Sequence, residues 1–302
     1  MKTEKCLFSV VIPAYNYADS LPRALESVLQ QSGNDYEVLI VDDGSTDNTR
    51  DVIDHLRSTY PGRFDAVTRE NSGPAAVRNF GINNTTGEWL IFLDADDELM
   101  PDALDNLRRF ISEHDTVRII VGGHMVADAD GSERYRGVKT LPTDPGDCLV
   151  GYLLKKTITP SNGATAMHRS IFQHCRYPEQ FRNSEDIPVF AYALTNFESA
   201  ALDKPLNRIH KHSDSLRHNL KYANDIGTRL IEEVFREDLI PAHLQKYKRI
   251  YAGQRCLSLF RTFYLAGQKQ PALKYYREAL GYDWRALFKI SYTKKAIRLL
   301  VA

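Results

Sequence analysis

Two acidic side chains with i, i+2 spacing, Asp94 and Asp96, follow an apolar, strand-like segment at Trp89–Leu93. In extended chain, residues i and i+2 point to the same side, so both carboxylates can face one ligand while Ala95 turns away. Carboxylate oxygens are ligands that Mg²⁺ and Mn²⁺ prefer, and these ions keep further positions for water and substrate phosphates. The pair therefore predicts a metal–phosphate site. The alternative is a solvated acidic turn that caps a helix starting near Pro101.

Polar groups also follow two other strand-like segments near the N-terminus. Tyr15 lies just after Leu7–Ile12, where its ring could stack on a nucleobase or pack as ordinary structure. Asp42 and Asp43 follow Tyr36–Val41, and they could accept hydrogen bonds from a base N–H or a ribose hydroxyl. One of the two could instead form an Asx-type turn. Because parallel sheets bind ligands beyond the carboxyl ends of their strands, three polar strand ends predict one binding site.

Two common ways of binding a nucleotide are excluded. No G-x-G-x-x-G follows the first strand-like segment, and no G-x-x-x-x-G-K-[ST] occurs, so neither a dinucleotide fold nor a P-loop is expected. A metal ion that bridges carboxylates to phosphate is then the expected alternative. Arg78 lies one turn into a helix predicted over Pro74–Asn83, a position suited to phosphate or base contact. Its alternative role is a surface salt bridge.

Strand-like and helical segments alternate through the first hundred residues. The expected strands are Leu7–Ile12, Tyr36–Val41, Phe64–Thr68 and Trp89–Leu93, and the expected helices are Ser20–Gln31, Asn48–Ser58 and Pro74–Asn83. Strands separated by helices indicate an α/β fold with a mainly parallel, Rossmann-like sheet and helices on both faces.

The rest of the chain has a less regular pattern. The expected elements are strands at Val117–Val121 and Ala164–His168, a loop or hairpin at Ala127–Gly146, and helices from about Tyr222 that Pro241 and a turn at Lys269–Pro271 divide. We therefore expect a catalytic domain over residues 1–222 and an α-helical C-terminal appendage over residues 223–302.

Charge is distributed unevenly along the chain. Residues 1–240 carry 26 Lys and Arg against 37 Asp and Glu, whereas residues 241–302 carry 13 Lys and Arg against only Glu278 and Asp283. This basic region is also rich in aromatic residues, so it could lie on an anionic membrane surface, pack on the acidic body or contact a second subunit in a homo-oligomer. No nucleic-acid partner is expected, because the basic residues follow no recognisable motif.

The four cysteines lie far apart without metal-ligand spacing, which indicates free thiols in a reducing compartment. Met1–Lys5 leads directly into a strand-like segment without a signal-peptide pattern, and no apolar stretch approaches the roughly 18 residues of a membrane span. We therefore expect a cytoplasmic protein.

Four segments together resemble glycosyltransferase family 2. They are Ser9–Asn16 (SVVIPAYN), Glu37–Asp47 (EVLIVDDGSTD), Asn71–Asn79 (NSGPAAVRN) and Gly87–Asp97 (GEWLIFLDADD). The resemblance covers about the first 110 residues almost continuously. It implies the GT-A fold, with a donor half over residues 1–110 and an acceptor half over residues 111–222. It also implies a nucleotide-diphospho-sugar donor and inversion at the anomeric carbon.

The resemblance further implies roles for individual residues. Pro13 and Tyr15 would line the base pocket, and Asp43 would bind the base edge. Arg78 would contact base or phosphate, Asp94 would hold the ribose, and Asp96 would hold Mn²⁺ or Mg²⁺. Asp42 and Ala95 would complete the donor site. UDP is the commonest donor nucleotide in the family, so a UDP-sugar is expected. Members that build bacterial surface polysaccharides often act at the inner membrane face. A glycan or lipid-linked glycan acceptor and a peripheral membrane position are therefore expected.

Two later segments resemble further family features. The pair Glu185-Asp186 implies Asp186 as the general base, because an inverting displacement needs a carboxylate to take the proton of the acceptor hydroxyl. The alternative is a helix N-cap, and the following Ile187-Pro188 departs from the family pattern. Arg208–Ser215 resembles the family's R-x-H-x-x-S-x-S segment and implies His210 as a metal or pyrophosphate ligand, although a lone histidine is often structural. His212, Lys211 and Arg217 lie beside it.

Two other functions share this layout. A nucleotidyltransferase would need a Gly-rich, basic signature after the first strand, which is absent. A non-catalytic nucleotide-sugar-binding or scaffold protein would be expected to lack the acids, yet Asp43, Asp94, Asp96 and Asp186 are all present. We therefore expect a metal-dependent glycosyltransferase and keep the non-catalytic protein as the alternative.

Overall fold

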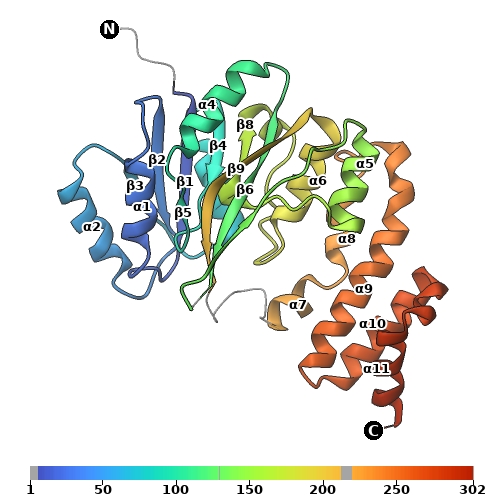
Figure 1. Ribbon diagram of the computed structural model, residues 1–302. Coiled ribbons are helices and arrows are strands. Elements are labelled where there is room, and N and C mark those ends of the chain that lie inside the picture. The colour runs from blue at the N-terminus through green and yellow to red at the C-terminus, as the bar shows by residue number, and fades with distance from the viewer. Residues whose placement is uncertain (1–5, 129, 212–219, 302) are drawn as a thin grey trace.

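The computed structural model describes residues 6–128, 130–211 and 220–301 (Figure 1). Its first part consists of β1 (Phe8–Ala14), α1 (Leu21–Leu29), β2 (Tyr36–Asp42), α2 (Thr49–Thr59), β3 (Asp65–Thr68), α3 (Pro74–Asn83), β4 (Trp89–Phe92), β5 (Glu98–Leu99) and α4 (Ala103–Glu113). Each strand and helix expected in the first hundred residues is present, with ends that differ by a few residues at most.

The middle of the chain contains shorter elements. They are β6 (Ile119–Ala127), β7 (Glu133–Arg136), α5 (Pro145–Leu149), the π-helix η1 (Val150–Lys155), the 3₁₀ helices η2 (Asn162–Ala164) and η3 (Arg169–Gln173), β8 (Thr165–His168), α6 (Asp186–Asn196) and β9 (Ser199–His210). β7 pairs with β6 in an antiparallel hairpin. A hairpin is one of the two structures, loop or hairpin, expected for Ala127–Gly146.

The described strands form one nine-stranded sheet in the order β3-β2-β1-β4-β8-β6-β9-β5, with β7 beside β6. β1 pairs in parallel with β2 and β4, β2 with β3, and β6 with β9. β8 is antiparallel to both of its neighbours, and β5 is antiparallel to β9. The predicted α/β fold with a mainly parallel sheet is therefore confirmed.

Both faces of the sheet are covered by helices (Figure 1). Along β1, Val10 and Ile12 belong to a hydrophobic cluster that contains Leu25 of α1, whereas Val11 belongs to a second cluster that contains Val77 of α3. The β1 side chains in both clusters are fully buried. A strand that is apolar at successive positions is expected where both faces are covered, because alternate side chains point to opposite faces.

The sequence analysis did not find β9, which is the longest described strand. The polar run Asp203-Lys204-Pro205 interrupts its apolar pattern. In the structure, the register of β9 against β6 shifts at this point, so Asp203 and Lys204 bulge out of the pairing. Asp203 there accepts a hydrogen bond from the Tyr135 hydroxyl at 2.6 Å. A bulge of this kind lets a strand contain a proline, which cannot donate to the ladder.

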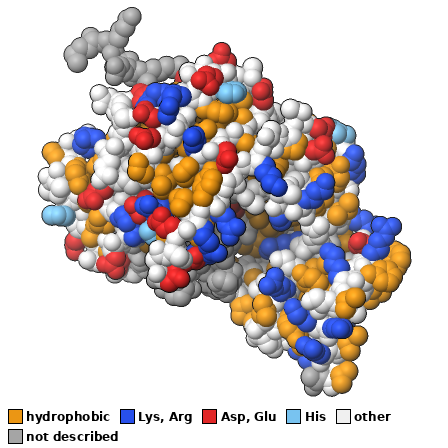
Figure 2. Space-filling view, viewed as in Figure 1, with side chains coloured by type: hydrophobic (Ala, Val, Ile, Leu, Met, Phe, Trp, Pro, Cys, Tyr) orange, Lys and Arg blue, Asp and Glu red, His pale blue; other side chains and the backbone are white. Residues whose placement is uncertain are grey.

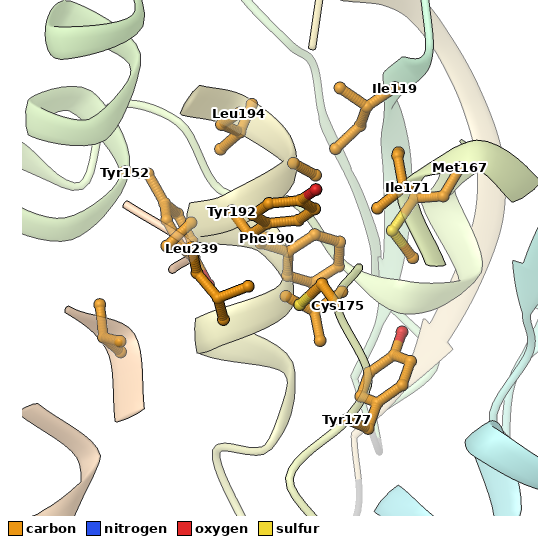
Figure 3. Packing of buried hydrophobic residues seen from close by; sticks show 14 of the residues in the cluster. Ile119, Tyr152, Met167, Ile171, Cys175, Tyr177, Phe190, Tyr192, Leu194 and Leu239 are labelled. Atoms are coloured by element: carbon orange, nitrogen blue, oxygen red, sulfur yellow. The ribbon is translucent and has the colours of Figure 1, made fainter. Parts of the chain in front are cut away.

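Helix α6 lies inside the larger hydrophobic cluster rather than on the surface (Figure 3). Phe190, Tyr192 and Leu194 are each at most 6% exposed. Tyr152 of η1 packs edge-on against Phe190, with ring centroids 6.2 Å apart, and Leu239 joins the same cluster. A helix that is apolar around its whole circumference is expected to be buried. Its first turn is therefore held rigidly.

The C-terminal region is helical, as expected. It contains α7 (Leu220–Ile226), α8 (Arg229–Val234), the 3₁₀ helix η5 (Ala242–Tyr247), α9 (Lys248–Leu265), α10 (Lys269–Tyr282), the 3₁₀ helix η6 (Trp284–Phe288) and α11 (Ile290–Val301). The break expected at Lys269–Pro271 lies slightly earlier, at residues 266–268. Pro271 instead occupies the first turn of α10, where a proline is tolerated.

Helices α9 to α11 form an appendage that projects from the body (Figure 1). Phe260, Phe263 and Tyr276 belong to a hydrophobic cluster of their own. Leu230 of α8 and Tyr251 of α9 belong to the larger cluster of the body. The domain boundary at residues 222/223 stays a prediction. Among the described helices, none combines the length and the apolar character that crossing a bilayer requires.

Candidate functional site

The carboxyl ends of β1, β2 and β4 lie next to one another. Ala14 and Asp42 are partners in the β1–β2 register, and the Asp43 N–H donates to the Ala14 carbonyl at 2.8 Å. On the other side of β1, the Leu93 N–H donates to the Val11 carbonyl at 2.9 Å. The three polar strand ends that the sequence predicts to converge therefore lie at one edge of the sheet.

The acidic segment after β4 is a tight turn rather than extended chain. The Asp97 N–H donates to the Asp94 carbonyl at 3.0 Å. Ala95 and Asp97 are buried, whereas Asp94 and Asp96 are partly exposed. The pair Asp94 and Asp96 is thus open to a ligand while Ala95 turns inward. A turn, and not strand periodicity, produces this arrangement.

The three carboxyl groups of this turn repel one another. Burial raises the pKa of Asp97 to about 9, and the negative charges of Asp94 and Asp96 add to this increase. Loss of surrounding water also raises the pKa of Asp94, although Arg78 acts in the opposite direction. An acidic cluster of this kind favours a proton or a bound cation. Asp97, which the sequence analysis left without a role, accepts a hydrogen bond from the His210 backbone N–H at 3.1 Å.

Arg78 joins the acidic turn to the segment before α6. Its guanidinium donates to Glu185 and, at 3.1 Å, to Asp94, and its side chain is only 5% exposed. The guanidinium carbon lies 5.5 Å from the ring centroid of Tyr177. Burial alone would lower the pKa of Arg78, but Glu185 and Asp94 outweigh this effect and raise it. The salt bridge considered for Arg78 is present, but it is buried, and its contact with a donor stays a prediction.

Asp186 is the first residue of α6, and Glu185 is the N-cap residue. Pro188 falls within the first turn, so the departure from the family pattern does not prevent the helix from starting here. Burial and the neighbouring Glu185 raise the pKa of Asp186 to about 6, and Arg78 opposes them. A carboxylate with this pKa is ionised at neutral pH and remains basic enough to accept a proton. Through Arg78, it lies beside the acidic turn.

Asp42 and Asp43 both hold loops in place. The Asp42 carboxylate accepts from the Ser45 N–H at 2.9 Å, three residues on and not the two of the Asx turn considered for one of the pair. The Asp43 carboxylate accepts from the Ser72 and Gly73 N–H groups, each at 2.8 Å. Both acids are almost fully buried. Asp42 therefore shapes the loop before α2 and Asp43 the loop before α3, and direct contact of either with a base stays a prediction.

The remaining predicted donor residues lie at the mouth of this edge. Tyr15 is 44% exposed, and Pro13 is half-buried near the end of β1. Tyr17 was not singled out from the sequence. Its hydroxyl hydrogen-bonds to the Asp96 side chain, and burial together with Asp96 raises the pKa of Tyr17. Only its position two residues beyond Tyr15 could have indicated it.

His210 does not point its ring toward Asp96. Its Nε2 lies 2.6 Å from Glu98, a residue that the sequence analysis did not single out, and Arg23 and Arg208 also contact Glu98. Within the part of the chain that the structure describes, no group of three His, Cys, Asp or Glu residues is arranged to hold a metal ion. His210 as a ligand stays a prediction. His212 and Arg217 lie outside the described residues, and Lys211 pairs with Asp128 at 2.9 Å.

Comparison with known proteins shows a sequence match. The profile described as "Glycosyl transferase family 2" matches residues 9–176, more than half of the chain. An uncharacterized glycosyltransferase of Nostoc sp. is 40% identical over 126 residues, which are 42% of this chain and 38% of that protein. The minor teichoic acid biosynthesis protein GgaA of Bacillus subtilis is 35% identical over 120 residues, which are 38% of this chain and 27% of that protein. The chain spans well under half of the length of these curated relatives.

Two solved structures share the fold. S. aureus TarS 1-349 in complex with UDP-GlcNAc has a TM-score of 0.70 and 20% identity, covering 97% of this chain and 89% of that one. The mannosyltransferase PcManGT from Pyrobaculum calidifontis, in complex with GDP-Man and Mn²⁺, has a TM-score of 0.57 and 16% identity, covering 99% and 85%.

The Arg78 contacts can be tested by substitution with a side chain of similar length. We expect Arg78→Met to lower the free energy of unfolding by about 3 kcal/mol at neutral pH, because it leaves buried carboxylates without their partner. The loss should shrink in acid, where protonation of Asp94 removes part of the repulsion. Urea unfolding of both proteins measures the difference.

Arg57→Met is the matched control, since Arg57 forms an exposed ion pair with Asp54 at 3.1 Å. This substitution should lower the free energy of unfolding by less than about 1 kcal/mol. Equal costs for the two variants would contradict the view that Arg78 holds the site together.

Proposed function

Because this chain belongs to glycosyltransferase family 2, we propose that it transfers a sugar from a nucleotide-diphospho-sugar to a hydroxyl of a glycan or lipid-linked glycan. The observation that carries the proposal is the contact of the buried Arg78 guanidinium with both the partly exposed Asp94 and the buried Glu185. This contact places the acidic turn, suited to a donor diphosphate, beside Asp186, suited to an acceptor hydroxyl.

Asp186 is proposed as the general base of a single inverting displacement. It takes the proton of the acceptor hydroxyl while that oxygen forms a bond to the anomeric carbon. The bond from this carbon to the diphosphate oxygen breaks, and its electron pair leaves with the nucleoside diphosphate. Arg78 keeps Asp186 ionised at neutral pH by opposing the effect of Glu185. Positioning and stabilisation of the leaving group supply the rest of the rate.

A divalent cation, Mn²⁺ or Mg²⁺, fits the acidic turn. The donors there are hard carboxylate oxygens. Burial, with a further contribution from the neighbouring carboxylates, raises the pKa values of Asp94 and Asp97, and a bound cation would offset both effects. Asp96 would hold the ion, with His210 as a further ligand if its ring turned from Glu98. The ion would neutralise charge on the leaving diphosphate. The presence of Mn²⁺ with PcManGT, which has the same fold, supports this choice.

UDP is the proposed donor nucleotide. The complexes of TarS with UDP and UDP-GlcNAc support it, because that protein shares the fold over nearly the whole chain. The exposed Tyr15 ring would stack on the base, Asp94 would bind the ribose, and Asp43 would bind the base edge. Pro13, Asp42 and Ala95 would shape the same pocket.

We propose that the protein works at an anionic membrane surface, on the cytoplasmic side. Trp284, Phe288 and Ile290 are each more than 60% exposed, which is unusual for large apolar side chains. Residues 284–302 also contain five Lys and Arg and no Asp or Glu. Figure 2 shows hydrophobic and basic side chains together on this part of the molecule. Apolar side chains that enter the headgroup region beside cations bind anionic bilayers.

The base assignment can be tested with Asp186→Asn. We expect the turnover number to fall by at least about a hundredfold, because a general base contributes roughly 10² to 10⁴. The dissociation constant for UDP should stay within about twofold of the original. In the unchanged protein, activity should rise with pH and level off above about pH 6, where Asp186 has lost its proton.

Several neighbouring groups set the pKa of Asp186. Besides burial, they are Glu185, Arg78 and Asp94. The charge of Asp186 acts in turn on the titratable groups around it, Tyr152, Tyr177, Tyr251 and Lys156. Asp54→Asn, an exposed carboxylate on α2, is the control and should leave turnover unchanged. Near-normal turnover of Asp186→Asn would show that another group is the base.

Donor and metal can be tested together by thermal shift. We expect UDP with Mn²⁺ to raise the melting temperature more than GDP or dTDP with Mn²⁺, because a ligand at about 100 times its Kd adds about 2.7 kcal/mol. Asp96→Asn should remove most of the dependence on Mn²⁺. A stronger effect of GDP would contradict the choice of nucleotide, and stabilisation by UDP without any metal would contradict the metal site.

Membrane binding can be tested by flotation with vesicles. We expect the protein to float with vesicles that contain phosphatidylglycerol and not with neutral phosphatidylcholine vesicles. The double variant Trp284→Ser/Phe288→Ser should lose most of this binding, whereas Val67→Ser, an exposed apolar residue on β3, should keep it. Unchanged flotation of the double variant would refute the proposal. A dimer that this variant dissociates would show instead that the face contacts a second copy.

A further inference from the structure

Lys156 lies near Asp186. It follows η1 with a positive φ of 56°, a conformation that few residues other than glycine adopt. Its Nζ lies 5.7 Å from the ring centroid of Tyr152, and that ring packs edge-on against Phe190. Phe190 lies one helical turn from Asp186 on the same side of α6. The ammonium group of Lys156 is thus held near the first turn of α6 by a tyrosine.

Arg255 approaches the same region from α9, which packs against η1. Its Nε donates to the Gly227 carbonyl at 3.1 Å, and the side chain is half-buried. Tyr251, one turn earlier on α9, packs against Phe235 with ring centroids 5.8 Å apart. Burial raises the pKa of Tyr251 to about 12, Arg255 opposes this, and the charge of Asp186 adds to it. Arg255 and Asp186 therefore both lie close to Tyr251.

Neither cation has an acidic partner among the residues that the structure describes. Arg78, by contrast, contacts two carboxylates, and Arg236 likewise contacts Glu233 and Asp238. Burial lowers the pKa of Lys156 and of Arg255, and the two charges also repel each other. A bound anion would relieve both effects. Figure 2 shows a hollow between the body and the C-terminal helices, with Lys and Arg side chains along it.

We propose that Lys156 and Arg255 form a subsite for an anionic group of the acceptor, a phosphate or carboxylate carried next to the hydroxyl that Asp186 deprotonates. This inference rests on the proposed function and names the class of acceptor. An anionic acceptor that approaches Asp186, Glu185 and Asp94 is repelled by them. Two unpaired cations beside the base offset that repulsion.

The placement favours the acceptor over the donor. In an inverting displacement, the attacking oxygen and the leaving diphosphate lie on opposite faces of the anomeric carbon. The acidic turn at the strand ends is the proposed diphosphate side, and Asp186 marks the other side. Lys156 follows η1, whose Tyr152 packs on Phe190 of α6, and Arg255 lies on α9, which packs against η1.

A purely structural role for Lys156 and Arg255 explains fewer of these observations than an anion subsite does. A cation at the end of η1 is favoured by the helix dipole, but Lys155 already supplies one in the last turn. The Gly227 carbonyl needs one donor, whereas a guanidinium offers five N–H groups. The positive φ of Lys156 is that of a left-handed C-cap and is explained by the end of η1. The guanidinium N–H groups of Arg255 for which no acceptor is found within the described residues fit a ligand site.

Binding of charged and neutral oligomers to the full chain tests the proposal. The probes are oligo(glycerol phosphate), oligogalacturonate and the neutral maltohexaose, each with a fluorescent label and measured by anisotropy with UDP and Mn²⁺ present. We expect at least one anionic probe to bind about tenfold more tightly than maltohexaose at low salt, a difference of about 1.4 kcal/mol. The phosphate and carboxylate probes show which anion the subsite takes.

The double variant Lys156→Gln/Arg255→Gln should weaken binding of that anionic probe by about tenfold. Its matched control is Arg261→Gln/Lys269→Gln, which removes the same charge from exposed positions on α9 and at the start of α10. The control should change binding by less than about twofold. If the first variant failed to fold, the salt dependence of binding would be measured in its place. NaCl should weaken binding of the anionic probe and leave binding of maltohexaose unchanged.

Equal binding of charged and neutral probes, or unchanged binding by the double variant, would overturn the subsite. A loss of UDP affinity in the double variant would also overturn it, because the two cations would then serve the donor diphosphate. The proposed function is tested separately. It would be refuted if the unchanged protein released no UDP from any UDP-sugar tested, regardless of how the anionic probes bind.

Discussion

The buried guanidinium of Arg78 holds the site together. It touches one carboxylate from the end of β4 and one from the start of α6, two segments separated by about 90 residues of chain. A charge removed from water is unfavourable unless it is paired, so the three groups are stable only when all are in place. The arrangement of the proposed donor and acceptor sides relative to each other depends on this contact.

Other parts of the fold position the three groups. Arg78 lies on α3, whose start is set by the Asp43 carboxylate holding the Ser72 and Gly73 N–H groups. Gly73 has a φ of 93°, and a side chain there would meet Arg182 at 2.7 Å, so the loops before α3 and α6 fit only through a glycine. Asp94 is placed by the register of β4 on β1. The buried α6 fixes Glu185 and Asp186.

The acidic edge of the sheet could be predicted because its signals are local. Apolar strands that end in acids show both the sheet edge and the side chains that lie there. The partner of Arg78 could not be predicted, since Glu185 lies 107 residues away and nothing near Arg78 indicates it. β9 was missed because its bulge at Asp203 interrupts the alternation on which strand prediction depends. The ring of His210 was assigned by resemblance, and its contact with Glu98 depends on the pairing of β5 with β9.

The hydrogen bond from the His210 backbone to Asp97 spans 113 residues. A chain that emerges from the ribosome can pair β1, β2, β3 and β4 early, because these strands are close in sequence. The acidic turn, however, obtains this hydrogen bond only after β9 has been synthesised and has paired with β6. Contacts of such separation form slowly, since the entropy of closing a long loop comes first. Competence to bind the donor is therefore expected to be among the last properties that the nascent chain acquires.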